Sequence, residues 1–192
     1  MVLRSTFAAI ALVVAGVAAP TLAADKYVID SQHVWVRFSI QHNVWAKALG
    51  SFRGVKGEIL FDEGNVAGSS VTAEIDAASV DTLDESRDSE VKGDFLHVIR
   101  YPNITFTSTK VEKTGEKEGN VVGDLTISGK TKPVTLSVTF NAAEVSPFNG
   151  KRTLGFSAHG RFNTNDFEIR QLKTLDIGPA LDFEIEVEAI KE

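Results

Sequence analysis

The sequence predicts an all-β domain of eight antiparallel strands with one short helix inserted between them. From residue 33 onward apolar side chains recur at every second position, which is the period of a strand with one buried face. Clusters of Gly, Asn, Asp and Pro separate these stretches, as in DEGN (62–65), SGKTKP (128–133) and SPFNG (146–150), and such clusters are typical of tight turns. Short antiparallel connections disfavour a parallel α/β sheet and leave two architectures, a sandwich and an up-and-down barrel.

The predicted strands follow one another with the same alternation. In the first, Val34, Val36, Phe38 and Ile40 share one face, and Trp35 and Arg37 lie on the other. The second strand covers roughly residues 50–61. The remaining six are predicted at residues 70–76, 103–111, 121–128, 133–140, 152–162 and 181–190.

One segment between the third and fourth strands departs from this period. Residues 82–96 begin with Thr82, followed three positions later by Glu85, which is the pattern of a capping box. Apolar residues then recur at multiples of four, at Leu83, Val91 and Phe95. The pattern predicts one short helix of two to three turns that lies across an edge or an open end of the sheet.

Arg87 belongs to the same four-residue series and has two interpretations. Its guanidinium either pairs with Asp84 or Glu90 on the helix surface or stands as a fixed cation at the mouth of a cavity. The sequence leaves both open.

The first residues of the chain predict a secretory signal peptide, residues 1–23 or 1–24. Arg4 precedes an apolar run that ends before Pro20, and small residues follow at the expected cleavage site. A retained membrane anchor is the alternative, but the apolar run is shorter than the roughly 20 residues that cross a bilayer. Residues 25–192 then form a single domain, with no stable membrane insertion after the signal is removed.

Charge and cysteine content exclude several classes of function. The net charge is −6, and removal of Arg4 makes it about −7, which argues against nucleic acid or an anionic membrane surface as partner. The chain has no cysteine, so a thiol enzyme, a Cys-ligated metal site and a lipid-modified N-terminal cysteine are all excluded.

The sequence contains no arrangement that predicts catalysis or metal binding. His33 and His42 are nine residues apart in one extended strand, which places them roughly 30 Å apart on opposite faces. No Gly-x-Ser-x-Gly motif occurs, and the carboxylates of residues 182–188 alternate with apolar residues as the solvent face of a strand. We therefore predict neither an enzyme nor a metal site.

The interior of such a barrel is either filled or hollow. An eight-stranded barrel is just wide enough to be packed by its own side chains or to hold one small ligand. Many of the twelve phenylalanines point inward and favour filling, whereas Ala73, Gly123, Ala158 and Gly160 on the same faces leave room. Composition alone does not decide between the two.

Several blocks in order resemble the YceI-like family of exported, polyisoprenoid-binding proteins. They are HVWVRFSIQH (33–42), GSFRGVKGEILFD (50–62), ASVDTLDESRDSEVKGDFL (78–96), YPNITFTSTKV (101–111), VVGDLTISGKTKPVTLSVTF (121–140) and GFSAHGRFNTNDFEI (155–169). The resemblance implies a periplasmic, lipocalin-like β-barrel that binds, transports or stores an isoprenoid lipid, such as a polyprenyl chain or a quinone tail, without reacting with it. The implied protein is a monomer or a homodimer with no other cofactor.

In this interpretation the inward residues form the wall of an apolar tunnel. The predicted ligand-binding residues are Val34, Val36, Phe38, Ile40, Ile59, Phe61, Val71, Ile75, Phe95, Ile104, Phe106, Leu125, Ile127, Leu136, Val138, Phe156, Phe162, Phe183 and Ile185. His42, Arg87 and Asp88 match family positions and are candidates for head-group or entrance contacts, although support of the junction between helix and barrel explains them equally well. The alternative function is a secreted stress-response or interaction module with a filled core and no ligand.

Overall fold

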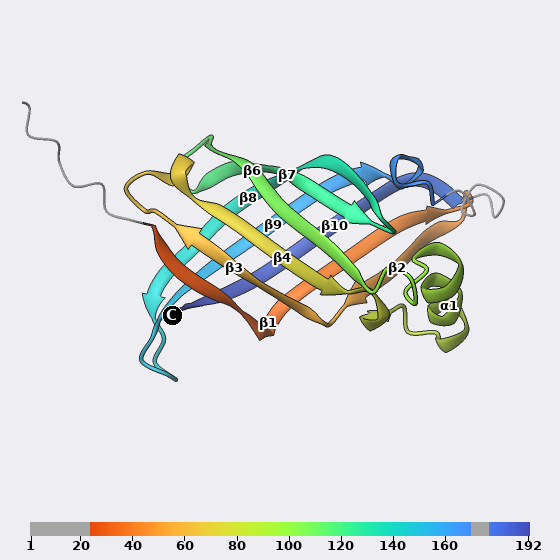
Figure 1. The fold of residues 1–192 in the computed structure, drawn as a ribbon, viewed down its shortest axis with the longest axis horizontal. Helices are drawn as coiled ribbons and strands as arrows, with labels where there is room; N and C mark the ends of the chain where they lie inside the picture. Colours follow the sequence, from red (N-terminus) through yellow and green to blue (C-terminus); the bar gives the residue numbers. More distant parts are fainter. Residues whose placement is uncertain (1–23, 170–176) are drawn as a thin grey trace, which may run out of the picture.

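Eight strands close into an antiparallel barrel in the computed structural model of the chain, which describes residues 24–169 and 177–192 (Figure 1). Around the barrel the strands follow the order β1, β3, β4, β6, β7, β8, β9 and β10, and β10 pairs with β1 to complete the ring. Their bounds are β1 Asp25–His42, β3 Val55–Phe61, β4 Ser70–Asp76, β6 Asn103–Lys113, β7 Glu118–Ile127, β8 Lys130–Val145, β9 Arg152–Asn163 and β10 Ile177–Lys191. The prediction of an eight-stranded antiparallel barrel is confirmed, and the sandwich is excluded.

Two short strands lie at one end of the ring. β2 (Ala46–Phe52) precedes β3 and pairs with β1, and β5 (Val80–Asp81) follows β4 and pairs with β2. The single strand predicted over 50–61 is therefore interrupted at Arg53 and Gly54. The hydroxyl of Ser79 accepts hydrogen bonds from both amides, at 3.2 and 3.0 Å, so the interruption leaves neither donor unsatisfied.

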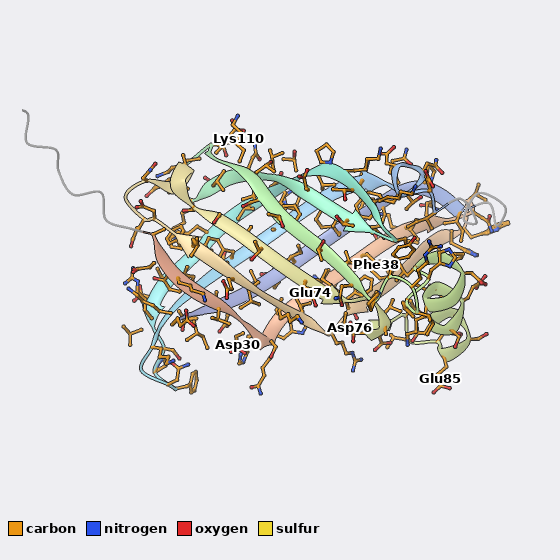
Figure 2. The ribbon with its side chains drawn as sticks, viewed as in Figure 1. Asp30, Phe38, Glu74, Asp76, Glu85 and Lys110 are labelled. Atoms are coloured by element: carbon orange, nitrogen blue, oxygen red, sulfur yellow. The ribbon has the colours of Figure 1, made fainter. Side chains whose placement is uncertain are left out.

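β1 begins eight residues earlier than the sequence predicts, because a bulge reverses its alternation. Tyr27 and Ile29 point inward before the bulge, and Val34 points inward after it, so the buried positions change from odd to even. Asp30 lies at this bend (Figure 2) and accepts a hydrogen bond from the amide of Gln32. The register also shifts in β6 between Ser108 and Lys110 and in β8 between Phe140 and Ala142.

The helical segment is shorter than predicted and begins three residues later. α1 (Glu85–Glu90) continues into a wider π-helical turn, η3 (Val91–Phe95). The predicted capping box is wrong, because the side chain of Asp84, not Thr82, accepts from the amide of Arg87 at the start of the helix. Leu83 precedes the helix with a positive φ of 62° and is exposed, so it does not belong to the apolar stripe.

The two ends of the barrel are built differently. α1 and η3 lie at one end, together with the β1–β2 turn and the short helix η4 (Thr164–Phe167), whereas the C terminus lies at the other (Figure 1). The remaining short helices are η1 (Val66–Gly68) and η2 (Ala77–Ser79). One buried core cluster, with Ile40, Phe167 and Phe183, lies toward the α1 end; a second contains Tyr27, Leu154 and Ala189.

The predicted signal peptide, residues 1–23, lies outside the described residues. Within the described ranges, no helix combines the length and the hydropathy that a membrane crossing requires.

Candidate functional site

An open cavity of about 880 Å³ extends through the barrel. Every strand of the ring contributes to its wall, and the wall consists mainly of Val, Ile, Leu, Phe and Ala side chains. Charged lining residues lie toward the two ends. This volume is within the range of about 300–1,000 Å³ that is usual for small-molecule sites, and the interior is therefore not filled.

The cavity is long as well as apolar. Glu118 and Ile127, near the two ends of β7, both line it. Nine residue steps of about 3.4 Å along a strand tilted by about 40° correspond to about 23 Å along the barrel axis. A cavity of this length and polarity suits an extended hydrocarbon chain better than a compact polar molecule.

Inward phenylalanine rings leave the lumen open because several of them cover glycines of a neighbouring strand. Phe38 covers Gly50, Phe106 covers Gly123 and Phe183 covers Gly160, and a Cβ atom on any of these glycines would overlap the ring. A ring held against a glycine lies along the wall and does not project into the lumen. This arrangement explains how a barrel rich in phenylalanine remains hollow.

The structure places all nineteen predicted tunnel residues on the wall of the cavity. They are Val34, Val36, Phe38, Ile40, Ile59, Phe61, Val71, Ile75, Phe95, Ile104, Phe106, Leu125, Ile127, Leu136, Val138, Phe156, Phe162, Phe183 and Ile185. That these residues contact a ligand remains a prediction.

The predicted set of tunnel residues omits several residues that line the cavity. Ile29, Phe52 and Val55 were missed because they lie beyond the bulge of β1 or beside the interruption between β2 and β3. Phe140 lines the cavity and packs with Phe61 and Phe156, at ring-centroid distances of 5.5 and 5.4 Å. Continued alternation in 133–140 was the signal that placed Phe140 on the inward face.

At the α1 end of the cavity, Arg87 has a partner that neither sequence interpretation named. Its Nε donates to the hydroxyl of Thr82 at 2.9 Å, and its Nη2 donates to the Thr82 carbonyl at 2.7 Å. His42 and Arg87 both line the mouth. Fixed by two hydrogen bonds to a buried threonine, the guanidinium is a preorganised cation at the entrance.

Asp88 does not line the cavity, in contrast to the other two entrance candidates. Its Oδ1 accepts from the amide of Thr82 at 2.7 Å and from the Thr82 hydroxyl at 2.6 Å. Through these contacts Asp88 stabilises the junction between the helix and the barrel. Through Thr82, Asp88 also positions Arg87.

Hydrogen bonds from Thr82 lower the pKa of Asp88 below its ordinary value of 3.8. Because the folded protein favours the carboxylate, this stabilisation is complete at neutral pH and is lost as the pH falls through the lowered pKa. We expect Asp88→Ala to reduce the free energy of unfolding by about 1–2 kcal/mol at pH 7, with a smaller difference in acid, as measured by urea unfolding. If the loss in the free energy of unfolding were the same at neutral and acid pH, the negative charge of Asp88 would not contribute to stability.

The opposite mouth of the cavity is rich in charged residues. Glu63, Lys113, Glu116, Lys117 and Glu118 all line this end, between the turns that connect β3 to β4 and β6 to β7. The barrel is thus asymmetric, because this mouth has more charged lining residues than the α1 mouth, where Lys47, Arg87 and Glu90 line the cavity.

Metal-ligand clusters and shifted pKa values are two features by which catalytic sites are recognised. None of the described residues form a group of three His, Asp or Glu side chains that could hold a metal ion. Groups with shifted pKa values lie off the cavity wall; besides Asp88 they are Lys26, Asp30, His33, Lys56, Arg152, Arg161 and Asp182. Their shifts arise mainly from hydrogen bonds to neighbouring side chains, as between Arg161 and Asp182.

Comparison with known proteins assigns the family. The model of the YceI-like domain matches residues 27–189 of the chain. The chain belongs to the YceI family. Protein YceI of Escherichia coli O157:H7 is 41% identical over 181 residues, which cover 91% of both proteins.

Solved structures of other proteins share the YceI barrel. The YceI protein of Campylobacter jejuni has a TM-score of 0.70 at 29% identity, and the match covers 79% of this chain and 90% of that one. A polyisoprenoid binding domain from Saccharophagus degradans has a TM-score of 0.68 at 13% identity, covering 86% of this chain and 98% of that one. At that identity the second likeness concerns the fold alone.

Proposed function

We propose that this protein binds a long-chain isoprenoid lipid, a polyprenyl chain or the tail of a quinone, inside its barrel in the periplasm. It transports or stores the lipid and performs no reaction on it. The observation that carries the proposal is the long cavity of about 880 Å³ with an apolar wall. The YceI family and the likeness of fold to a polyisoprenoid binding domain support it.

Burial of the hydrocarbon chain would supply the binding free energy. At about 25 cal/mol per Å², each 100 Å² of apolar surface removed from water contributes about 2.5 kcal/mol. A chain of several isoprene units buries several times that area, which outweighs the cost of ordering its bonds. Because the wall provides no pattern of buried hydrogen-bonding groups, selection rests on length and shape.

The head group of the lipid would lie at the α1 end. Arg87 is held there by Thr82, and His42 lies at the end of β1 on the same mouth. A cationic guanidinium in this position suits a polar or anionic head group, such as a phosphate or a quinone carbonyl. The apolar chain would then extend along the lumen toward the charged mouth.

The open cavity argues against the alternative of a filled interaction module. A barrel without a ligand gains nothing from an 880 Å³ cavity, because packed interiors are more stable than hollow ones. The proposal of no catalysis rests on the chemistry of the cavity wall, which is almost entirely hydrocarbon along its length.

Organic extraction tests the proposal. We expect protein purified from its native periplasm to release a polyprenyl or quinone species in near-stoichiometric amount, identified by mass spectrometry. Incubation with quinones or polyprenyl phosphates should return them unchanged. An empty extract at several growth conditions would refute the proposed ligand, and chemical conversion of the added lipid would refute the absence of catalysis.

A further inference from the structure

Large apolar side chains are exposed on the rim of the α1 mouth. Val44 and Trp45 lie in the turn between β1 and β2 and are 83% and 82% exposed. The residues that flank this turn, His42 and Ala46, both line the cavity. The tip of the hairpin therefore stands directly beside the opening. Leu49, 64% exposed on β2, continues this surface and also lines the mouth.

Leu83 reaches the same part of the rim and is not explained by stability. Asp81 of β5 pairs with Ser51 of β2, the strand that carries Leu49, and Leu83 follows two residues after Asp81. Leu83 is 92% exposed and has a left-handed backbone, which disfavours a leucine. An exposed leucine in a strained backbone conformation does not stabilise the fold, which indicates that Leu83 has another role.

Ile99 completes the set. It is 98% exposed and lies between Leu96 and Ile104, both of which line the cavity at this end. We call Val44, Trp45, Leu49, Leu83 and Ile99 the apolar rim. Single exposed apolar residues are common, but five of them on the segments next to one opening indicate an interaction surface.

Several charged groups near the apolar rim are paired within the protein. Lys47 bonds to Asp182 at 3.1 Å and Lys130 to Glu168 at 3.0 Å, and Arg53 pairs with Asp81. Figure 2 shows Glu85 on the outer side of α1, directed away from the barrel. Arg87 and Glu90 also line this mouth, so a partner at the opening would meet the exposed apolar side chains together with these two charged groups.

We propose that the apolar rim docks onto the surface of a lipid bilayer, with the α1 mouth facing the membrane. This inference rests on the proposed function, since a lipid that leaves a bilayer for the cavity must otherwise cross water. Trp45 suits the role because indole rings prefer the boundary between head groups and hydrocarbon. Val44, Leu83 and Ile99 would insert beside it, and the charged opposite mouth would remain in water.

Vesicle flotation tests the docking with phosphatidylcholine vesicles that contain no isoprenoid. We expect the protein to float with the vesicles, and Val44→Ser/Trp45→Ser to reduce the bound fraction at least about tenfold, because two apolar side chains no longer insert. Leu83→Asn should weaken binding without lowering Tm, since asparagine tolerates the left-handed backbone. Phe148→Ser is the matched control, because Phe148 is 96% exposed in the β8–β9 turn and does not line the cavity.

Fluorescence provides a second readout. The chain has two tryptophans, so Trp35→Phe leaves Trp45 as the only one, and its emission should shift to the blue when vesicles are added. Replacing part of the phosphatidylcholine with phosphatidylglycerol should weaken binding, because the chain carries a net charge of −6. No flotation of the unmodified protein, or equal flotation of all variants, would overturn the proposal.

A second copy of the chain is the competing occupant of the apolar rim. If light scattering shows a dimer that Val44→Ser/Trp45→Ser dissociates, and vesicles do not bind, the rim is a protein interface and the docking is refuted. Extraction of the same variants separates the two proposals. If the variants keep their isoprenoid content but no longer float with vesicles, the docking proposal is supported. If the unmodified protein floats but its extract contains no isoprenoid, the proposed ligand is refuted and the docking proposal stands.

Discussion

Replacement of Ala158 by tryptophan is expected to abolish isoprenoid binding while the barrel remains folded. Ala158 lines the middle of the cavity on β9, between Val138 on β8 and Ile185 on β10. An indole at this position occupies the path of the hydrocarbon chain, and its ring is accommodated by existing space. We expect at least a tenfold loss of extracted lipid, with Tm within a few degrees of the unmodified protein.

The neighbouring residue provides the control. His159 is exposed on the outer face of the same strand, so His159→Trp introduces the same side chain outside the lumen and should leave the lipid content unchanged. In a filled core, Ala158→Trp would instead cost about 1–3 kcal/mol through overpacking. A large drop in Tm for Ala158→Trp alone would therefore contradict an open cavity.

Gly160→Ala is expected to destabilise the barrel wall strongly for so small a substitution. The new Cβ would overlap the ring of Phe183 and lie 2.9 Å from the backbone carbonyl oxygen of Thr135. The ring can move only into the lumen, and the carbonyl belongs to the adjacent strand and cannot move alone. We expect a loss of about 2–3 kcal/mol in the free energy of unfolding, measured by urea denaturation.

A second glycine on β9 is the matched control for this effect. At Gly155 a Cβ would meet only the Cβ of Asn141, at 3.6 Å, which is ordinary contact. Gly155→Ala should therefore leave the free energy of unfolding unchanged or raise it by up to about 1 kcal/mol, because alanine lowers the conformational entropy of the unfolded chain. Equal losses at the two positions would show that the cost comes from strand propensity and not from the ring that covers Gly160.

The inward face of each strand could be predicted from the sequence wherever the alternation is unbroken. Val34, Val36 and Phe38 were placed correctly on the inward face. A shift of the strand by one residue would move every side chain to the opposite face, so the apolar row can face the interior in only one register. The same rule failed for Ile29, since the bulge after it changes the parity. The residues of this bulge, DSQH (30–33), do not by themselves indicate where the alternation changes.

The helix shows a different limit of sequence reasoning. Thr82 and Glu85 have the spacing of a capping box, but Thr82 is buried and hydrogen-bonded to Asp88 and Arg87. Asp84 then caps the helix instead. Local preference was overridden by the contacts that fix the segment to the barrel, and these contacts join residues whose proximity depends on the whole fold.

The sequence by itself determined the fold class, the inward face of each strand wherever its alternation is unbroken, and the absence of cysteine chemistry, because period-two burial and composition are local properties. Only the tertiary structure decided that the barrel is hollow. Whether Phe183 fills the lumen or lies along the wall depends on Gly160 of another strand, and the sequence contains no record of that pairing. The apolar rim likewise depends on the tertiary structure, because the fold brings the β1–β2 hairpin and the α1 segment to the same end of the barrel.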